Sequence, residues 1–225
     1  MHASLTLVSL LAAGALGLVA PKQQPLEDQS ISSSKLDLIY ELKKAEIIPT
    51  VIDTFTPSVS ISIEWSNATA EYGNTINPSK VQEEPSLKLV DSPPSVRSSM
   101  QYTVALTDPD APSRDDPEWS EICHWIATFV PLTSSSDSDA GTLGHLKEIM
   151  PYKPPGPPPK TGKHRYVFVA LAPKNGTTDK LHLSEPADRQ HWGYDKERQG
   201  VRMWAESNGL EVVGANFIYA KNDEQ

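Results

Sequence analysis

One segment of the sequence alternates strictly between apolar and polar residues. Its apolar positions are Val59, Ile61, Ile63 and Trp65, and serines and a glutamate stand between them. A period of two is typical of a strand with one buried face, so a strand is predicted over 59–65. Two nearly continuous apolar runs, over 122–130 and 166–172, indicate strands buried on both faces. Further strands are predicted over 87–89, 102–106 and 210–219.

Helical spacing of apolar residues is found in two stretches. The first covers 35–48 and is ended by Pro49; its apolar residues, which roughly share one face, are Leu36, Ile39, Tyr40, Leu42 and Ile47. The second covers 195–208, with Gly209 as its C-terminal stop. The 20 prolines, many of them clustered, interrupt long helices because proline lacks the amide donor. Since loops separate most strands, we expect a mainly β fold with an antiparallel arrangement and a few short peripheral helices.

The N-terminal residues have the composition of a leader. Residues 5–20 are apolar and rich in Leu and Ala, but this run is too short for a convincing membrane span. We interpret residues 1–20 as a signal peptide, 21–34 as a mobile leader and 35–225 as one domain. A short amphipathic or buried N-terminal helix is the alternative. The first interpretation predicts a secreted or vacuolar protein without a transmembrane span.

Two sequence triplets fit N-glycosylation, provided that the chain enters the secretory pathway. They begin at Asn67 and Asn175, and neither has proline at its middle position. Cys123 is the single cysteine, so the chain has no internal disulfide. We expect Cys123 to be a small buried residue inside a strand.

The charge balance argues against two classes of partner. The chain has 29 acidic and 20 basic residues, a formal net charge of −9. Nucleic acid is not an expected partner because phosphate contacts need a basic surface. Adsorption to anionic lipid by charge alone is not expected either, because that attraction depends on clustered basic residues.

A proline-braced segment contains the first candidate site residues. Asp108 and Asp110 stand in the sequence DPDAPSR, directly after a predicted strand. If the segment is extended, residues two apart face the same way, and both carboxylates could point to one site. The alternative, which the segment taken alone favours, is a stiff turn whose carboxylates accept backbone amides.

Two further segments contain polar residues in unusual settings. His124 lies in the apolar run 122–130 and needs a hydrogen-bond partner if it is buried; a satisfied core histidine is the alternative. Farther on, a rigid proline stretch with two glycines, 156–162, precedes a strand that opens with His164 and Tyr166. These two residues are two apart and are expected to share a face. A proline-rich surface ligand for another domain is the alternative here.

Taken together, the three segments resemble the signature blocks of the phosphatidylethanolamine-binding protein family. Their order and wide separation match, and the similarity is clear over 102–172. The Asp-rich block and the Trp after His124 are most similar to the fungal branch, which includes a carboxypeptidase Y inhibitor. The resemblance implies an antiparallel β-sandwich with a small ligand pocket at one end. Many animal relatives close this pocket with a last helix, which we expect to be absent because the sequence ends at Gln225, soon after the final predicted strand.

The resemblance also implies roles for individual residues. Asp108 and Asp110 match the paired acids at the pocket rim, and His124 matches the pocket histidine. The loop wall corresponds to Gly156, Pro157 and Pro158, and the remaining ligand-facing residues to His164 and Tyr166. Arg165 is expected to point away and to pair with an acid.

These roles predict a non-enzymatic binding protein without a cofactor. Histidines near carboxylates favour their protonated form and can hold a phosphate-like anion, while a carboxylate accepts the ammonium of a phospholipid headgroup. The first alternative is an inhibitor of a serine carboxypeptidase. The second is a metal-dependent hydrolase built from Asp108, Asp110, His124 and His164. The second is disfavoured because H-E-x-x-H, G-x-S-x-G and a phosphate-binding glycine loop are absent from the sequence.

Overall fold

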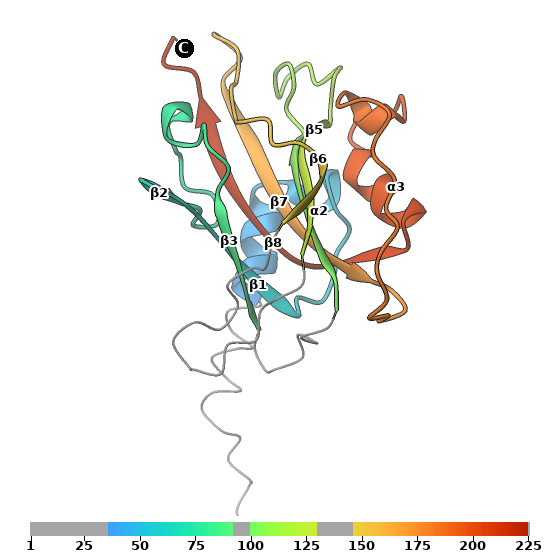
Figure 1. The fold of residues 1–225 in the computed structure, drawn as a ribbon. Helices are drawn as coiled ribbons and strands as arrows, with labels where there is room; N and C mark the ends of the chain where they lie inside the picture. The colour runs from blue at the N-terminus through green and yellow to red at the C-terminus, as the bar shows by residue number, and fades with distance from the viewer. Residues whose placement is uncertain (1–35, 92–99, 130–145, 225) are drawn as a thin grey trace, which may run out of the picture.

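The strands form two antiparallel sheets (Figure 1). The computed structural model describes residues 36–91, 100–129 and 146–224. The smaller sheet has the order β2-β1-β3, with β1 at Val59–Trp65, β2 at Ala68–Thr69 and β3 at Ser86–Asp91. The larger sheet has the order β6-β5-β4-β7-β8. Its strands are β4 Tyr102–Asp108, β5 Ile122–Phe129, β6 Lys147–Met150, β7 Lys163–Pro173 and β8 Leu210–Lys221. The predicted mainly β, antiparallel fold is confirmed.

The main core lies between the two sheets. The apolar positions of β1 are all buried, as its alternation predicts, and they pack with inward residues of the larger sheet such as Leu106 and Phe168. The sheets come very close at Gly214 of β8, where a Cβ atom would lie 2.5 Å from the carbonyl oxygen of Val59. Ser58 N–H also donates to the Val213 carbonyl there, at 2.9 Å. This close approach requires glycine at position 214.

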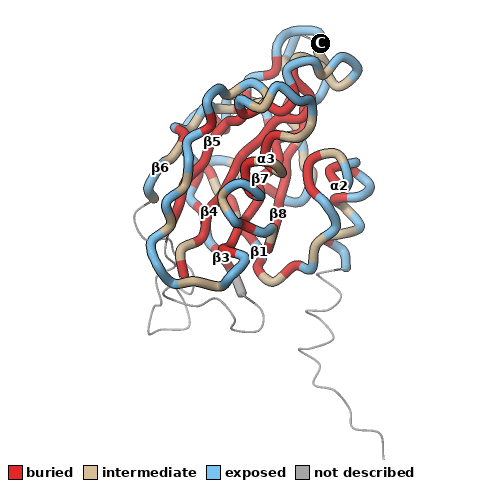
Figure 2. Tube along the Cα trace, turned by 90° about the vertical axis from the view of Figure 1, so that its right-hand side faces the viewer, coloured by how far each residue is buried: buried red, intermediate tan, exposed pale blue. Residues whose placement is uncertain are grey.

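A second core covers the other face of the larger sheet. Short helical segments lie on it, including α2 at Ile47–Thr50 and α3 at Gly200–Ser207, and the central strands are therefore buried on both sides (Figure 2). β7 is buried along almost its whole length, as its apolar run predicts. Among the described residues, no helix is both long enough and apolar enough to cross a membrane.

The predicted helix over 35–48 differs from the structure in its face and its length. Residues 36–44 are helical, and a turn at Glu46, with φ of 55°, separates them from α2. The buried residues are Leu38 and Leu42, whereas Leu36 and Tyr40 are 69% and 63% exposed. Leu36 and Leu42 lie about 120° apart on a helix of ~3.6 residues per turn, so they cannot share one buried face.

The second helix begins later than its periodicity predicts. α3 starts at Gly200 rather than at 195 because Asp195 and Arg198 have φ of 53° and 55°, which no right-handed helix accommodates. Trp204 is buried, and Gly209 follows the helix with φ of 66°. The predicted signal peptide and leader, and Val130 at the end of the predicted strand, lie outside the described residues.

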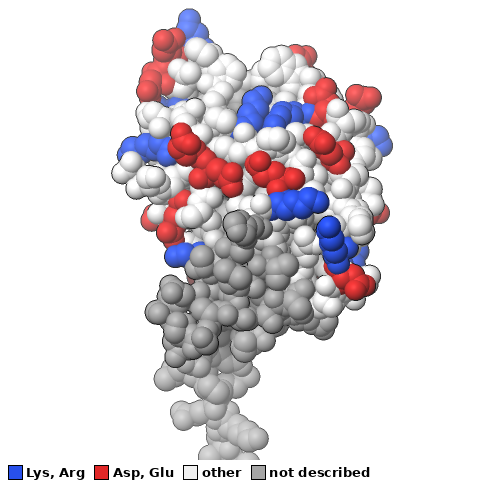
Figure 3. Space-filling view, viewed as in Figure 1, with Lys and Arg blue, Asp and Glu red and all other residues white. Residues whose placement is uncertain are grey.

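The surface carries charges of both signs. On the face seen in Figure 3, basic and acidic side chains are interspersed, and that face shows no extended basic field of the kind that nucleic acid requires. Asn67 and Asn175 are exposed, Asn67 in the turn between β1 and β2 and Asn175 just after β7. Both are therefore sterically accessible, and their glycosylation stays a prediction.

Candidate functional site

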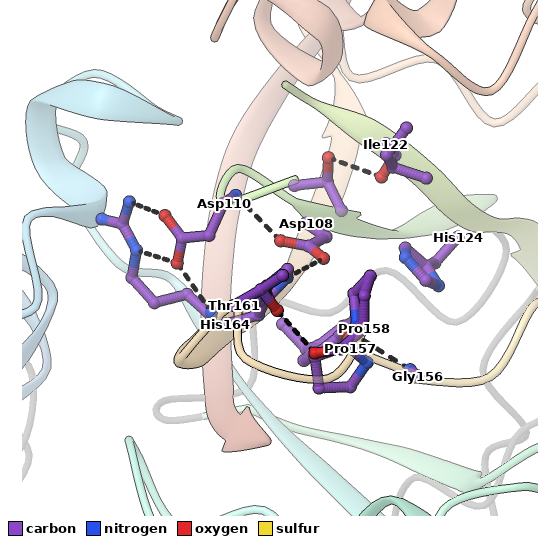
Figure 4. Close-up of polar contacts among 12 residues, drawn as sticks. Asp108, Asp110, Ile122, His124, Gly156, Pro157, Pro158, Thr161 and His164 are labelled. Carbon is purple, nitrogen blue, oxygen red and sulfur yellow. Dashed lines mark hydrogen bonds and ion pairs between the residues drawn. The ribbon is translucent and has the colours of Figure 1, made fainter. Parts of the chain in front are cut away.

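The antiparallel order of the larger sheet brings the three sequence segments to one end of it. β4 lies between β5 and β7, and it runs antiparallel to both. The last residue of β4, Asp108, is therefore next to the beginning of β5 and of β7. This places Asp108 near His124 on β5 and near His164 on β7 (Figure 4), and Tyr166 of β7 lies beside both histidines. We call these four residues the site cluster.

Asp108 organises one half of the site cluster. Its Oδ1 accepts the backbone N–H of Asp110 at 2.8 Å, and its Oδ2 accepts the Nδ1–H of His164 at 2.9 Å. The side chains of His164 and Asp108 are only 1% and 4% exposed. Water competes little for this contact, so the carboxylate holds the imidazole ring in one orientation.

Asp110 does not join Asp108 at the site. Its Oδ2 accepts Nε–H of Arg165 at 2.9 Å, and its Oδ1 accepts Nη2–H of the same residue at 2.5 Å. Both side chains are fully buried. Asp110 is thus occupied by Arg165, and its predicted place at the ligand-binding rim stays a prediction. The predicted pairing of Arg165 with an acid is confirmed.

The separation of the two carboxylates has a local cause. Asp108 is the last strand residue, and Asp110 already lies in a turn, so the period of two does not continue between them. On β7, His164 and Arg165 are consecutive and point to opposite faces. Each takes one of the two carboxylates (Figure 4).

Tyr166 lies between the two histidines. Its ring centroid is 5.2 Å from that of His124, nearly perpendicular at 85°, and 6.4 Å from that of His164, nearly parallel at 17°. The Tyr166 hydroxyl accepts the backbone N–H of Gly156 at 3.2 Å, which ties the proline segment to the cluster. The predicted shared face of His164 and Tyr166 is confirmed. Burial, and next the charge of Asp108, raise the pKa of Tyr166 well above its ordinary value.

The proline segment lies beside this cluster. Figure 4 shows Gly156, Pro157 and Pro158 next to His164. Thr161, which the sequence analysis did not single out, donates its hydroxyl proton to the Pro158 carbonyl at 2.8 Å. Its Oγ1 also lies 2.9 Å from Nε2 of His164. Since the hydroxyl has a single proton, which it donates to Pro158, Oγ1 of Thr161 acts as an acceptor toward Nε2 of His164.

His124 is neutral, contrary to the expectation that nearby carboxylates keep the histidines protonated. Burial lowers the pKa of His124 to about 4 and outweighs the opposing effect of the Asp108 charge. Its Nδ1 lies 2.7 Å from the carbonyl oxygen of Lys153. A carbonyl only accepts, so Nδ1 carries the ring proton and Nε2 has a free lone pair.

Sequence reasoning also missed Glu121, which directly precedes β5. It is fully buried, and its Oε2 accepts the hydroxyl of Thr107 at 2.8 Å and the N–H of Val201 at 3.4 Å. Its Oε1 has no partner among the described residues. Burial raises the pKa of Glu121 to about 7. An acid at the edge of an apolar run is the sequence signal that points to it.

No metal-binding group is found in the described part of the chain, where no three His, Cys, Asp or Glu side chains gather closely enough to hold an ion. Asp110 is turned to Arg165, and the remaining acid of the predicted ligand set, Asp108, is bound to His164. The described residues thus offer no set of metal ligands for the alternative of a metal-dependent hydrolase.

Comparison with known proteins identifies the family. The family model described as phosphatidylethanolamine-binding protein matches residues 51–218. The chain belongs to this family. A curated member, the carboxypeptidase Y inhibitor of Saccharomyces cerevisiae, is 33% identical over 208 residues, which cover 81% of this chain and 94% of that protein.

Solved structures of phosphatidylethanolamine-binding proteins agree with the fold described above. A carboxypeptidase Y inhibitor, crystallised in complex with its cognate proteinase, has a TM-score of 0.75 and 31% identity, and the match covers 87% of this chain and 100% of that one. The family member from Plasmodium vivax has a TM-score of 0.61 at 23% identity, covers 82% of this chain and 97% of its own, and supports the fold alone.

Proposed function

We propose that the chain is a non-enzymatic binding protein that holds a phosphate-type anion, free or as a lipid headgroup, at the site cluster. One observation carries the proposal: four buried polar side chains converge from three strands beside the segment 156–158. Burying polar groups is unfavourable unless they are satisfied, and such clusters are common at binding sites. A ligand that forms hydrogen bonds with the cluster satisfies these buried polar groups.

The neighbouring side chains favour binding over catalysis. Burial raises the pKa of the Cys123 thiol far above neutrality, so it does not act as a thiolate nucleophile. Asp110 is bound to Arg165 through both oxygens and is not available as a base. Asp108 holds His164 by a hydrogen bond, an arrangement suited to orienting donors around a ligand.

Isothermal titration calorimetry with inorganic phosphate tests the proposal. Tyr166→Phe removes one hydroxyl from the cluster and is expected to weaken phosphate binding about five- to tenfold, the effect of one hydrogen bond. The matched control is Tyr194→Phe, because the Tyr194 hydroxyl contacts Ser207 away from the site cluster, and we expect it to bind phosphate like the wild type. Absence of phosphate binding by the folded wild-type protein would contradict the proposal.

A second candidate function is inhibition of a serine carboxypeptidase. It is supported by the 33% identity to the yeast carboxypeptidase Y inhibitor over 94% of that protein, and by the TM-score of 0.75 to an inhibitor crystallised with its proteinase. Similarity over nearly the whole length of a relative favours a shared binding mode. The secretory or vacuolar route predicted from residues 1–20 is compatible with such a target.

Titration of carboxypeptidase Y with the full chain tests this candidate. We expect peptidase activity to fall in a saturable manner, with a stoichiometric end point if binding is tight. A metallocarboxypeptidase assayed in parallel is the control and is expected to keep its rate. Unchanged rates of carboxypeptidase Y at a large excess of the folded chain would exclude this function for that enzyme.

A further inference from the structure

The proline wall cannot hold itself in place. We give this name to residues 154–159, part of which borders His164 of the site cluster in Figure 4. Five of the six residues are proline, so Gly156 has the only backbone N–H of the wall. A chain of prolines is stiff and forms no hydrogen bonds within itself. The position of the wall therefore depends on donors and acceptors that other residues supply.

Two contacts connect the wall to the site cluster. The N–H of Gly156 donates to the Tyr166 hydroxyl at 3.2 Å. Thr161, whose Oγ1 lies 2.9 Å from Nε2 of His164, donates its hydroxyl proton to the Pro158 carbonyl at 2.8 Å. A movement of the wall therefore changes the hydrogen bonding of Tyr166 and His164, the two cluster residues on β7.

Two amide side chains hold the wall from outside the site cluster. Nδ2 of Asn222, the residue directly after β8, donates to the Pro157 carbonyl at 3.2 Å. Nε2 of Gln82 donates to the Pro155 carbonyl at 3.3 Å. Pro155 and Pro157 are buried, unlike the other residues of the wall. The outside donors therefore act on the part of the wall that is packed against the protein.

Asn77 links these two outside donors. Its Oδ1 caps the 3₁₀-helix Pro78–Lys80. Gln82 is attached to the same helix, because its Nε2 also donates to a carbonyl there at 2.8 Å. Nδ2 of Asn77 donates to the carboxylate of Asp223, the neighbour of Asn222, at 3.1 Å. Asn77, Gln82 and Asn222 thus form one connected support, which we call the amide clamp.

The amide clamp holds less strongly than the contacts inside the site cluster. Its two hydrogen bonds to the wall join neutral, part-buried groups that water can reach, and each changes an equilibrium by about two- to tenfold. The contact between Asp108 and His164 is buried and involves a carboxylate. When the protein opens locally, we expect the clamp to break before the cluster does, so that the wall is the part that moves.

We infer that Asn222 is a positioning residue: through the Pro157 carbonyl it holds the proline wall against the site cluster and so regulates the affinity of the cluster for its anion. This inference rests on the proposed anion-binding function and adds its regulation. Separation of the wall from the amide clamp is the step that admits and releases the ligand. The apparent dissociation constant equals the intrinsic one divided by the fraction of molecules with the wall in place.

Asn222→Asp tests the inference because it removes the donor and keeps the acceptor. The aspartate retains an Oδ1 that accepts the N–H of Glu224, at 2.9 Å in the wild type, but it cannot donate to Pro157. We expect the Gly156 amide to exchange with solvent about three- to tenfold faster by NMR. In calorimetry near pH 7 we expect inorganic phosphate to bind about two- to tenfold more weakly. The midpoint of urea unfolding is expected to stay at the wild-type value.

Asn208→Asp is the matched control, with the same chemical change at the opposite end of β8. Nδ2 of Asn208 donates to Ser184 and to the Trp204 carbonyl, and its Oδ1 accepts the N–H of Ser184. This variant is expected to keep the wild-type exchange rate of the wall amide and the wild-type affinity for phosphate. Gln82→Glu removes the second donor to the wall and is expected to change both quantities in the same direction as Asn222→Asp.

The outcomes separate the inference from the proposed function. Unchanged exchange of the Gly156 amide in Asn222→Asp would show that the amide clamp does not hold the wall, and would overturn the inference. Faster exchange with wild-type affinity for phosphate would also overturn it and leave the anion site in place. A lowered urea midpoint with faster exchange throughout the core would show general destabilisation instead of positioning. Failure of the folded wild type to bind phosphate would overturn the proposed function itself.

Discussion

Arg165→Met is expected to lower the free energy of unfolding by about 3–5 kcal/mol at pH 7, the usual effect of removing one partner of a buried ion pair. The change leaves the Asp110 carboxylate, which is fully buried, without its bidentate partner. It also removes the Nη1 hydrogen bonds to the carbonyls of Ala45 and Glu46, both at 2.9 Å, which hold the end of helix 36–44 against the sheet. Urea unfolding measures the loss.

Two further variants show whether this loss comes from an unpaired buried charge. Asp110→Asn combined with Arg165→Met leaves neither charge behind, so we expect the double variant to be more stable than Arg165→Met alone. Arg114→Met breaks an ion pair with Glu46 in which both side chains are exposed, and we expect it to cost far less than Arg165→Met. A loss of similar size for Arg165→Met and Arg114→Met would contradict the interpretation.

Glu121→Gln is expected to gain stability relative to the wild type as pH rises, by about 3 kcal/mol between pH 4.5 and pH 8. In the folded protein burial raises the pKa of Glu121 to about 7, from an ordinary value of 4.5. Between these values the folded chain keeps a proton that the unfolded chain has released. The contribution of Glu121 to the free energy of unfolding is therefore fully present below pH 4.5 and is lost as pH rises through 7. A glutamine at this position does not titrate and shows no such loss.

His124 changes the free energy of unfolding with pH in the opposite direction to Glu121 over much of the same pH range. Burial lowers its pKa from 6.5 to about 4 in the folded state, so the unfolded chain takes up a proton first as pH falls. The stability that depends on neutral His124 is present above pH 6.5 and is lost toward pH 4. The two contributions oppose each other between about pH 4.5 and 6.5. We therefore expect the free energy of unfolding of the wild type to change little with pH in that range.

The difference between variant and wild type separates the two groups. Chemical unfolding at several pH values gives the free energy of unfolding as a function of pH. We expect the curves of Glu121→Gln and the wild type to diverge as pH rises. Glu118→Gln, an exposed acid three residues earlier, is the matched control and is expected to run parallel to the wild type. Parallel curves for Glu121→Gln as well would show that Glu121 is ionised normally in the folded protein.

The local pattern of apolar and polar residues was sufficient to predict much of the architecture. The alternation over 59–65 predicts the strand and its buried face, because a strand's two faces are set by a period of two along the chain itself. The apolar runs that became β5 and β7 predict strands covered on both faces. The order of the three polar segments was enough to indicate the family, and with it the place of His124 and His164.

The tertiary structure alone decided which groups meet and which are charged. Asp108 and Asp110 are alike in sequence, yet one holds His164 and the other Arg165, because a strand ends between them and β7 presents a different residue to each. The charges of His124 and Glu121 likewise depend on burial by segments distant in sequence. Hydrophobic period is a property of neighbouring residues, whereas desolvation and pairing arise from contacts made across the fold.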